Sequence, residues 1–120
     1  MAVPTSGLLV QVTGQAEIYF TLDGKYHHIP AWEVFLRLFP TGGTLREETS
    51  IASEYIGDPL GGDADVLKGK NDAAIFFYNN GKKRHILNWS FMVRAFNGQF
   101  REIPQAVIDT IPAGPAIPDA

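Results

Sequence analysis

Two pairs of histidine and tryptophan carry the most distinctive chemistry in this sequence. His28 precedes Trp32 by four residues, and His85 precedes Trp89 by the same interval. An imidazole can donate and accept hydrogen bonds, whereas an indole offers a broad apolar face. A sugar presents an apolar C–H face and a rim of hydroxyl groups, so such a pair suits stacking against a sugar ring. We therefore predict two related ligand-binding surfaces.

The other residue types and motifs of the sequence argue against catalysis. The chain has no cysteine, which excludes a thiolate nucleophile, a disulfide and a thiolate metal site. His27 and His28 are neighbours on a predicted strand, where successive side chains point to opposite faces, so they cannot hold one metal ion together. The signatures of zinc proteases, serine hydrolases, phosphate loops and dinucleotide-binding folds do not occur. We predict no catalytic residue, no bound metal and no cofactor.

An internal repeat must position both pairs. Residues 16–39 align with residues 73–96 at a shift of 57 positions, and ten of the 24 aligned residues are identical. Leu45-Arg46-Glu47 also matches residues 100–102 once a gap of two residues is allowed. We place repeat 1 at residues 7–61 and repeat 2 at residues 62–117, both within a single domain of residues 1–120.

Each repeat contains a predicted β-hairpin. Residues 18–22 alternate between two faces and run into Asp23-Gly24, while residues 75–78 run into Asn79-Asn80-Gly81. Turns of this composition accept positive φ angles and join adjacent strands. The implied register sets Tyr19 against His28 and Thr21 against Tyr26, and in repeat 2 it sets Phe76 against His85 and Tyr78 against Lys83.

This register, with the helix that follows, assembles the predicted surfaces. Their residues are Tyr19, Tyr26, His28 and Trp32 in repeat 1, and Phe76, Lys83, His85 and Trp89 in repeat 2. Lys83 offers a charge where Tyr26 offers a ring and a hydroxyl, so we expect repeat 2 to favour more acidic or more polar ligands. The alternative stays open that both tryptophans are core residues and both histidines are structural.

Helices and further short elements complete each repeat. Apolar residues recur at the spacing of one helix face at Trp32, Phe35, Leu36 and Phe39, and at Trp89, Met92, Val93 and Phe96. Pro30 suits the first turn of one helix, and Asn88 suits the N-cap of the other. We also predict leading strands at residues 8–12 and 65–68, and an extended tail over the surface from residue 111. Between each helix and a second weak helix, at 47–55 or 104–111, we predict a short extended piece around Leu45 or Phe100. The basic residues 82–84 suit a solvated strand edge.

These elements predict an α+β fold. It consists of two tandem β-hairpin-plus-helix repeats, each β-β-β-α with a short extra helix. A unit of this size is marginally stable alone. We therefore expect the repeats to share one core across a pseudo-twofold axis.

The segments GKYHHIPAWEVF (residues 24–35), GKKRHILNWSFMV (81–93) and IPAGPAI (111–117) resemble a tandem repeat of bacterial extracellular and cell-surface proteins. That repeat pairs a hairpin of the type GKKRxIP and a helix with a closing IPxGPxI. The resemblance implies an accessory binding or attachment module without activity of its own, at an extracellular or cell-surface location. Repeat 1 departs from the pattern at Tyr26-His27 and in a shorter closing motif at residues 56–60, which implies unequal sites.

Charge and hydropathy limit the classes of partner that we expect for this chain. The net charge of −3 argues against nucleic acid, which requires an excess of Lys and Arg. No apolar run approaches the length of a membrane helix, and the first residues lack the features of a signal peptide, so we expect neither in this chain. The expected partner is a glycan or cell-surface polysaccharide. The alternative is a structural protein that forms a homo-oligomer or another protein contact, for which a continuous exposed aromatic patch would be the mark.

Overall fold

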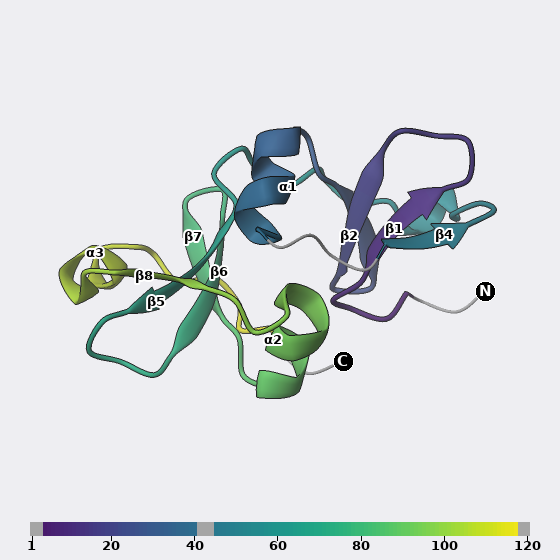
Figure 1. Ribbon diagram of the computed structural model, residues 1–120. Coiled ribbons are helices and arrows are strands. Elements are labelled where there is room, and N and C mark those ends of the chain that lie inside the picture. The colour runs from purple at the N-terminus through teal and green to yellow at the C-terminus, as the bar shows by residue number, and fades with distance from the viewer. Residues whose placement is uncertain (1–3, 41–44, 118–120) are drawn as a thin grey trace.

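Two four-stranded mixed sheets with the same internal order of strands form the framework of the protein (Figure 1). The computed structural model describes residues 4–40 and 45–117. The first sheet has the order β3-β2-β1-β4, formed by β1 (Leu9–Val12), β2 (Ile18–Leu22), β3 (Lys25–His28) and β4 (Leu45–Glu48). The second has the order β7-β6-β5-β8, formed by β5 (Asp65–Gly69), β6 (Ile75–Asn79), β7 (Lys82–His85) and β8 (Arg101–Ile103).

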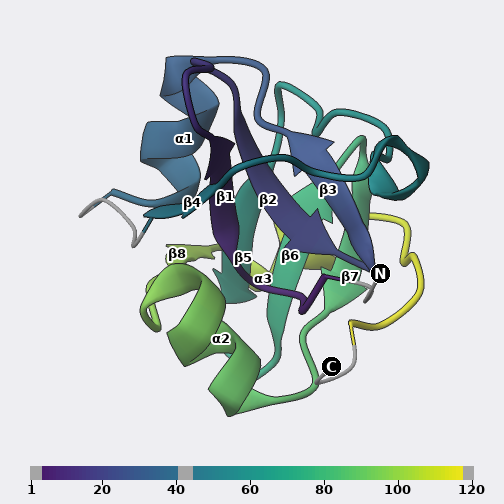
Figure 2. The same cartoon turned by 90° about the vertical axis from the view of Figure 1, so that its right-hand side faces the viewer.

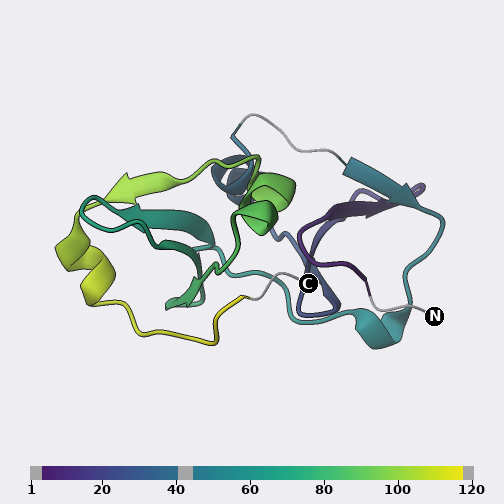
Figure 3. The same cartoon turned by 90° about the horizontal axis from the view of Figure 1, so that it is seen from below.

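The described helices are α1 (Trp32–Leu38), α2 (Trp89–Phe96) and α3 (Gln105–Asp109), and η1 (Ser53–Tyr55) is a single 3-10 turn. The result is a compact α+β domain with two similar halves, which confirms the predicted class. In Figures 1 and 3, α1 and α2 lie between the two sheets. Each helix can therefore contribute side chains to the space that both sheets face.

The two hairpins have the predicted register. Tyr19 pairs with His28, and Phe76 pairs with His85. The turn residues Asp23 and Asn80 have φ angles of 54° and 53°, and each is followed by a glycine that also has a positive φ. Both central positions are therefore left-handed, as a type I′ turn requires.

The fourth strand of each sheet corrects one prediction. β4 pairs in parallel with β1 and includes Glu47 and Glu48, so the predicted helix over residues 47–55 is wrong except for the single turn η1. β4 begins at Leu45 and β8 follows Phe100, where short extended pieces are predicted. Their parallel pairing, however, depends on the crossover through a helix, and no local pattern in the sequence reveals it. α3, in contrast, falls within the predicted residues 104–111.

The buried helix faces differ from the predicted stripes. α1 buries Val34 and Leu38, and α2 buries Phe91, Met92, Ala95 and Phe96. The residues that begin the predicted stripes are exposed instead, with relative accessibilities of 64% for Trp32 and 58% for Trp89. Leu36 and Val93 are exposed as well. Both helices are thus rotated about their axes, because each must pack against two sheets at once.

The first residues of the two helices confirm the predicted N-cap of α2 and contradict the predicted place of Pro30 in α1. The Asn88 side chain accepts a hydrogen bond from the Ser90 N–H at 2.7 Å, which confirms it as an N-cap. α1 begins after Ala31 without a side-chain cap, so Pro30 precedes the helix and does not lie in its first turn.

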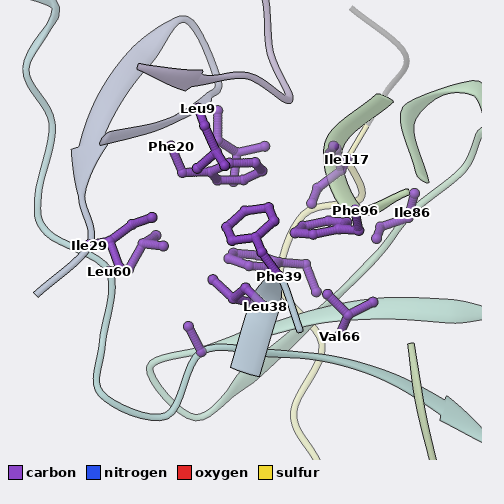
Figure 4. Packing of buried hydrophobic residues seen from close by; sticks show 14 of the residues in the cluster. Leu9, Phe20, Ile29, Leu38, Phe39, Leu60, Val66, Ile86, Phe96 and Ile117 are labelled. Carbon is purple, nitrogen blue, oxygen red and sulfur yellow. The ribbon is translucent and has the colours of Figure 1, made fainter. Parts of the chain in front are cut away.

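One hydrophobic cluster draws on both halves (Figure 4). The Phe20 ring centroid lies 6.0 Å from that of Phe77 and 5.4 Å from that of Phe96. Phe39 and Phe96 lie 5.7 Å apart, again across the boundary between the halves. The two halves therefore pack around one shared cluster.

Arginine side chains add hydrogen bonds between the halves. Arg37 Nη1 donates to the carbonyl oxygens of Gly62 and Ala64 at 2.7 and 3.2 Å. Arg94 Nε donates to the carbonyl oxygen of Ser6 at 3.1 Å. Each helix therefore binds the backbone segment that leads into the first strand of the other half.

The segments at residues 56–60 and 113–117 run along the outer edges of β3 and β7. Leu60 N–H donates to His28 at 2.9 Å, and Ile117 N–H donates to His85 at 2.8 Å, in each case to the carbonyl oxygen. The residues at positions 82–84 are therefore not a solvated edge, and the tail is not confined to the surface, because Ile117 is buried. Figure 2 shows this C-terminal segment on the side of the sheets away from α1 and α2.

An ion pair joins the first hairpin turn to the second sheet. Arg84 Nη1 and Nη2 donate to the Asp23 carboxylate at 2.6 and 3.0 Å. The hydrogen bond from Arg84, opposed by partial burial, lowers the pKa of Asp23 below its ordinary value. The charges of Arg84 and of His27 act in the same direction as the hydrogen bond.

Acidification should remove the stability that this ion pair supplies. Because the folded-state pKa of Asp23 is depressed, its contribution is present above the unfolded-state pKa and is lost as the pH falls through the folded-state value. We expect Asp23→Asn to be less stable than the wild type near neutral pH, and the difference to shrink below about pH 4. The effect is modest because the carboxylate is half exposed. Urea unfolding at neutral and acidic pH measures it, and an equal difference at both would contradict it.

Candidate functional site

Two hollows occupy corresponding places in the two halves. The His28 hollow lies between the start of β2, the end of β3 and the start of α1, with a volume of about 150 Å³. The His85 hollow lies between the start of β6, the end of β7 and the start of α2, with a volume of about 430 Å³. The first is lined by Ala16, Glu17, Ile18, His28, Ile29, Pro30, Ala31, Trp32 and Phe35. The second is lined by Asp72, Ala73, Ala74, Ile75, His85, Ile86, Leu87, Asn88, Trp89 and Met92.

Every residue of the His28 hollow has a counterpart in the His85 hollow at the shift of 57 positions. Local structure explains why the histidine and the tryptophan come together. His28 and His85 are the last residues of β3 and β7, and the next residue of each chain segment, Ile29 or Ile86, is buried and hydrogen-bonded back to the hairpin. The chain then turns into the helix, which places the tryptophan beside the strand end.

The Trp32 indole has an aromatic support. Its ring stacks on Phe35 with centroids 4.8 Å apart and an interplanar angle of 8°. Trp32 as a whole is nevertheless 64% exposed to solvent. A held, exposed aromatic ring is a suitable platform for the apolar face of a sugar.

Trp89 is similarly exposed but differently supported. Met92 takes the place of Phe35 and is buried in the core, so it offers no flat partner. A Cβ atom at Gly98 would lie 3.4 Å from Cζ2 of the Trp89 ring, so the indole lies beside the turn that follows α2. The two halves thus hold equivalent tryptophans in different surroundings.

The other predicted site residues lie close to the histidine in each half. In the first half, the Tyr19 ring lies 6.3 Å from Tyr26 and 5.8 Å from His28, centroid to centroid. Burial, and to a smaller extent the charge of Glu48, raises the pKa of the Tyr26 phenol, so this group stays a neutral donor. Tyr19 and Tyr26 flank His28 but do not line its hollow.

The corresponding cluster in the second half has a different chemistry. Phe76 and His85 have centroids 5.4 Å apart, and Lys83 Nζ lies 5.1 Å from the centre of the Phe76 ring. Lys83 Nζ also donates to the Ile108 carbonyl oxygen at 2.8 Å. Lys83 is therefore engaged by α3 and does not line the His85 hollow, which removes the basis for expecting acidic ligands there.

Three polar residues that line the hollows are not among the predicted site residues. Glu17 lines the first hollow, and Asp72 and Asn88 line the second. The Asp72 carboxylate accepts a hydrogen bond from the Ala74 N–H at 3.2 Å. Glu17 and Asp72 are not equivalent positions in the repeat, so comparison of the two copies does not single them out. Each hollow nevertheless combines a carboxylate, an imidazole and an indole.

His27, in contrast, has a structural role. Its Nδ1 lies 2.7 Å from the Asp58 carbonyl oxygen, and its Nε2 lies 3.0 Å from that of Leu22. Arg84, the equivalent residue of the second half, donates through Nε to the Pro115 carbonyl oxygen at 2.7 Å. Both residues thus tie the segment that follows η1 or α3 to its hairpin.

Within residues 4–40 and 45–117, no group of three or more His, Asp or Glu side chains is placed to hold a metal ion. Across the same described part of the chain, no helix has the length and apolar character needed to cross a membrane. Comparisons with protein family models, with curated proteins and with solved structures gave no significant match.

Proposed function

We propose that the chain is a non-catalytic binding module with two related carbohydrate sites, one at the His28 hollow and one at the His85 hollow. The observation that carries this proposal is the duplication of one arrangement of side chains. Each hollow joins an exposed indole to an imidazole and a carboxylate. The indole suits the C–H face of a sugar, and the polar groups suit its hydroxyls.

The form of the two sites supports carbohydrate over a protein interface. The hollows share no residue, and each has polar groups among its lining residues, which differs from one continuous apolar patch. The helices that carry the two tryptophans, α1 and α2, lie one above the other between the sheets in Figure 1. We therefore propose two separate sites, each taking its own glycan chain.

The reciprocal contacts between the halves favour the pseudo-twofold arrangement. Arg37 binds the segment that leads into the second sheet, and the equivalent Arg94 binds the segment that leads into the first. Exchange of equivalent contacts is the mark of an isologous interface. On this proposal, the resemblance of the repeats to surface-protein modules favours an extracellular or cell-surface location.

A homo-oligomer or another protein contact is the second candidate. Trp32 and Leu36 are exposed one helical turn apart on α1, and Trp89 and Val93 are exposed likewise on α2. Such apolar pairs are also found at protein interfaces. Sedimentation of the wild type and of Leu36→Ser with Val93→Ser distinguishes the two, because only the protein-interface candidate predicts an oligomer that this change dissociates.

A glycan array on the purified chain tests the proposal. We expect the wild type to bind a defined set of neutral glycans and the double variant Trp32→Ala, Trp89→Ala to bind none of them. Val107→Ala, which removes an exposed side chain of α3, is the matched control and should keep the wild-type profile. A double variant that keeps the wild-type profile would contradict the proposed sites.

The bound glycans should also stay intact during long incubation with the protein. Shortened products that disappear in His85→Ala would show a catalytic role for that imidazole and would overturn the non-catalytic part of the proposal.

A further inference from the structure

A third hollow lies at the junction of the two halves. It is bounded by the end of α1 and by the strands β5 and β8, and its volume is about 470 Å³. The first half contributes residues 36–38 and Pro40, and the second contributes Asp65, Val66 and residues 98–101. Sites for small molecules commonly have volumes of about 300–1,000 Å³ and commonly lie between structural units. The junction hollow has both properties, whereas the His28 hollow is smaller.

The interior of the junction hollow is apolar and partly uncovered. Leu38 and Val66 are almost fully buried, at 1% and 2% accessibility. Leu36 and Phe100, however, keep 44% and 40% of their surface in contact with water. A ligand with an apolar body would cover these two side chains, and the hydrophobic effect would favour its binding.

Two guanidinium groups line the same hollow, and neighbouring groups hold both in place. Arg37 Nη1 donates to the Gly62 and Ala64 carbonyl oxygens. Arg101 Nη2 donates to the carboxylate of Asp65, whose side chain is 5% exposed while that of Arg101 is 64% exposed. Each of these contacts uses one nitrogen of a guanidinium, which has five N–H donors in all.

The charges at the junction hollow do not cancel. Arg37 and Arg101 carry two positive charges, and Asp65 is the single carboxylate among the lining residues. A guanidinium fork matches the geometry of a carboxylate closely, and such hydrogen bonds are stronger than those between neutral groups. The hollow thus combines an exposed apolar wall with an excess of fixed positive charge.

We infer that the junction hollow binds a small organic carboxylate with an apolar body, the carboxylate on Arg37 and Arg101 and the body against Leu36 and Phe100. This inference is independent of the carbohydrate proposal, because the residues of the junction hollow belong to neither the His28 nor the His85 hollow. The ligand class is defined by one anionic group and one apolar group at opposite ends of a short molecule.

4-Phenylbutyrate at millimolar concentrations is the probe, followed by nuclear magnetic resonance of the isotope-labelled chain. We expect 4-phenylbutyrate to shift the resonances of Leu36, Val66 and Phe100. 4-Phenylbutanol, which lacks the charge, should bind about tenfold more weakly, because a hydrogen bond to a charged group contributes that much to affinity. Phe100→Ser should weaken binding by a similar factor, while Val107→Ser, which changes another exposed apolar residue on α3, should leave it unchanged.

The amide spectrum of Phe100→Ser shows whether this variant keeps the fold while losing the apolar wall. If the spectrum shows that Phe100→Ser is unfolded, Leu36→Ser is the second variant. Equal binding of the acid and the alcohol would overturn the inference. Shifts confined to residues outside the junction hollow, or no shifts at all, would overturn it as well.

Discussion

Phe20→Ala is expected to destabilise the entire chain by about 3–5 kcal/mol, the cost of deleting a large buried aromatic side chain. Phe20 is fully buried, and its ring packs against Phe39 of its own half and against Phe77 and Phe96 of the other. Since a domain of this size is stable by only about 5–15 kcal/mol, this is a large loss. Because the contacts cross between the halves, both halves should lose stability together.

Urea unfolding followed separately in each half measures this effect. Each helix begins with one of the two tryptophans of the chain, so Trp32→Phe and Trp89→Phe each leave one fluorescent reporter. We expect both reporters to show a single coincident transition that Phe20→Ala moves by the same amount. Leu45→Ala, which removes an exposed side chain of β4, is the control and should change little. Two separate transitions would contradict a shared core. So would a shift of the transition midpoint seen in Trp89→Phe alone, since its remaining reporter, Trp32, belongs to the half that contains Phe20.

The second large effect concerns binding. Trp32→Ala and Trp89→Ala should each weaken glycan binding at their own hollow by about 1–3 kcal/mol, roughly 5- to 150-fold, as expected for removal of an aromatic contact. Neither variant should unfold, because the two rings are 64% and 58% exposed and fill no part of the core. Trp32→Ala should cost slightly more stability than Trp89→Ala, since it also removes the stacking on Phe35.

Thermal unfolding and binding isotherms on the same preparations separate the two roles of each ring. Trp32→Phe and Trp89→Phe are matched controls that keep a smaller aromatic platform and should lose less affinity. A loss of about 3–5 kcal/mol of stability in both alanine variants would mean that these tryptophans hold the structure. The glycan site would then have to lie elsewhere.

The hairpins could be predicted from the sequence because their determinants are local. Asp23-Gly24 and Asn80-Gly81 accept positive φ angles, and a two-residue turn sets the pairing of every residue along both strands. Alternation of apolar and polar side chains then identifies which side chains share one face of the sheet. The same two local rules are sufficient to pair Tyr19 with His28 and Phe76 with His85.

The helix faces and the pairing of the fourth strands could not be predicted, because they depend on contacts far apart in the chain. A helix that packs on a single sheet buries one apolar stripe, but α1 and α2 lie between two sheets and bury faces that exclude Trp32 and Trp89. β4 becomes a strand only by parallel pairing with β1, even though all four of its residues are exposed.

The candidate site was predicted in part. His28 with Trp32 and His85 with Trp89 do line the two hollows, because strand end and helix start are close in sequence. The remaining site predictions, Tyr19, Tyr26, Phe76 and Lys83, lie on the same sheet faces but outside the hollows. Lys83 is held by the Ile108 carbonyl oxygen, a contact with a residue 25 positions away that the hairpin pattern does not reveal.

Binding stoichiometry tests the central claim most directly. Isothermal titration calorimetry with the strongest glycan from the array should give two sites per chain for the wild type and a weaker overall affinity for each single tryptophan variant. One site of wild-type affinity should remain in Trp32→Ala and one in Trp89→Ala, and no site of wild-type affinity should remain in the double variant. A wild type with one site or none, or a double variant that still binds two glycans per chain with wild-type affinity, would contradict the account of two duplicated carbohydrate sites.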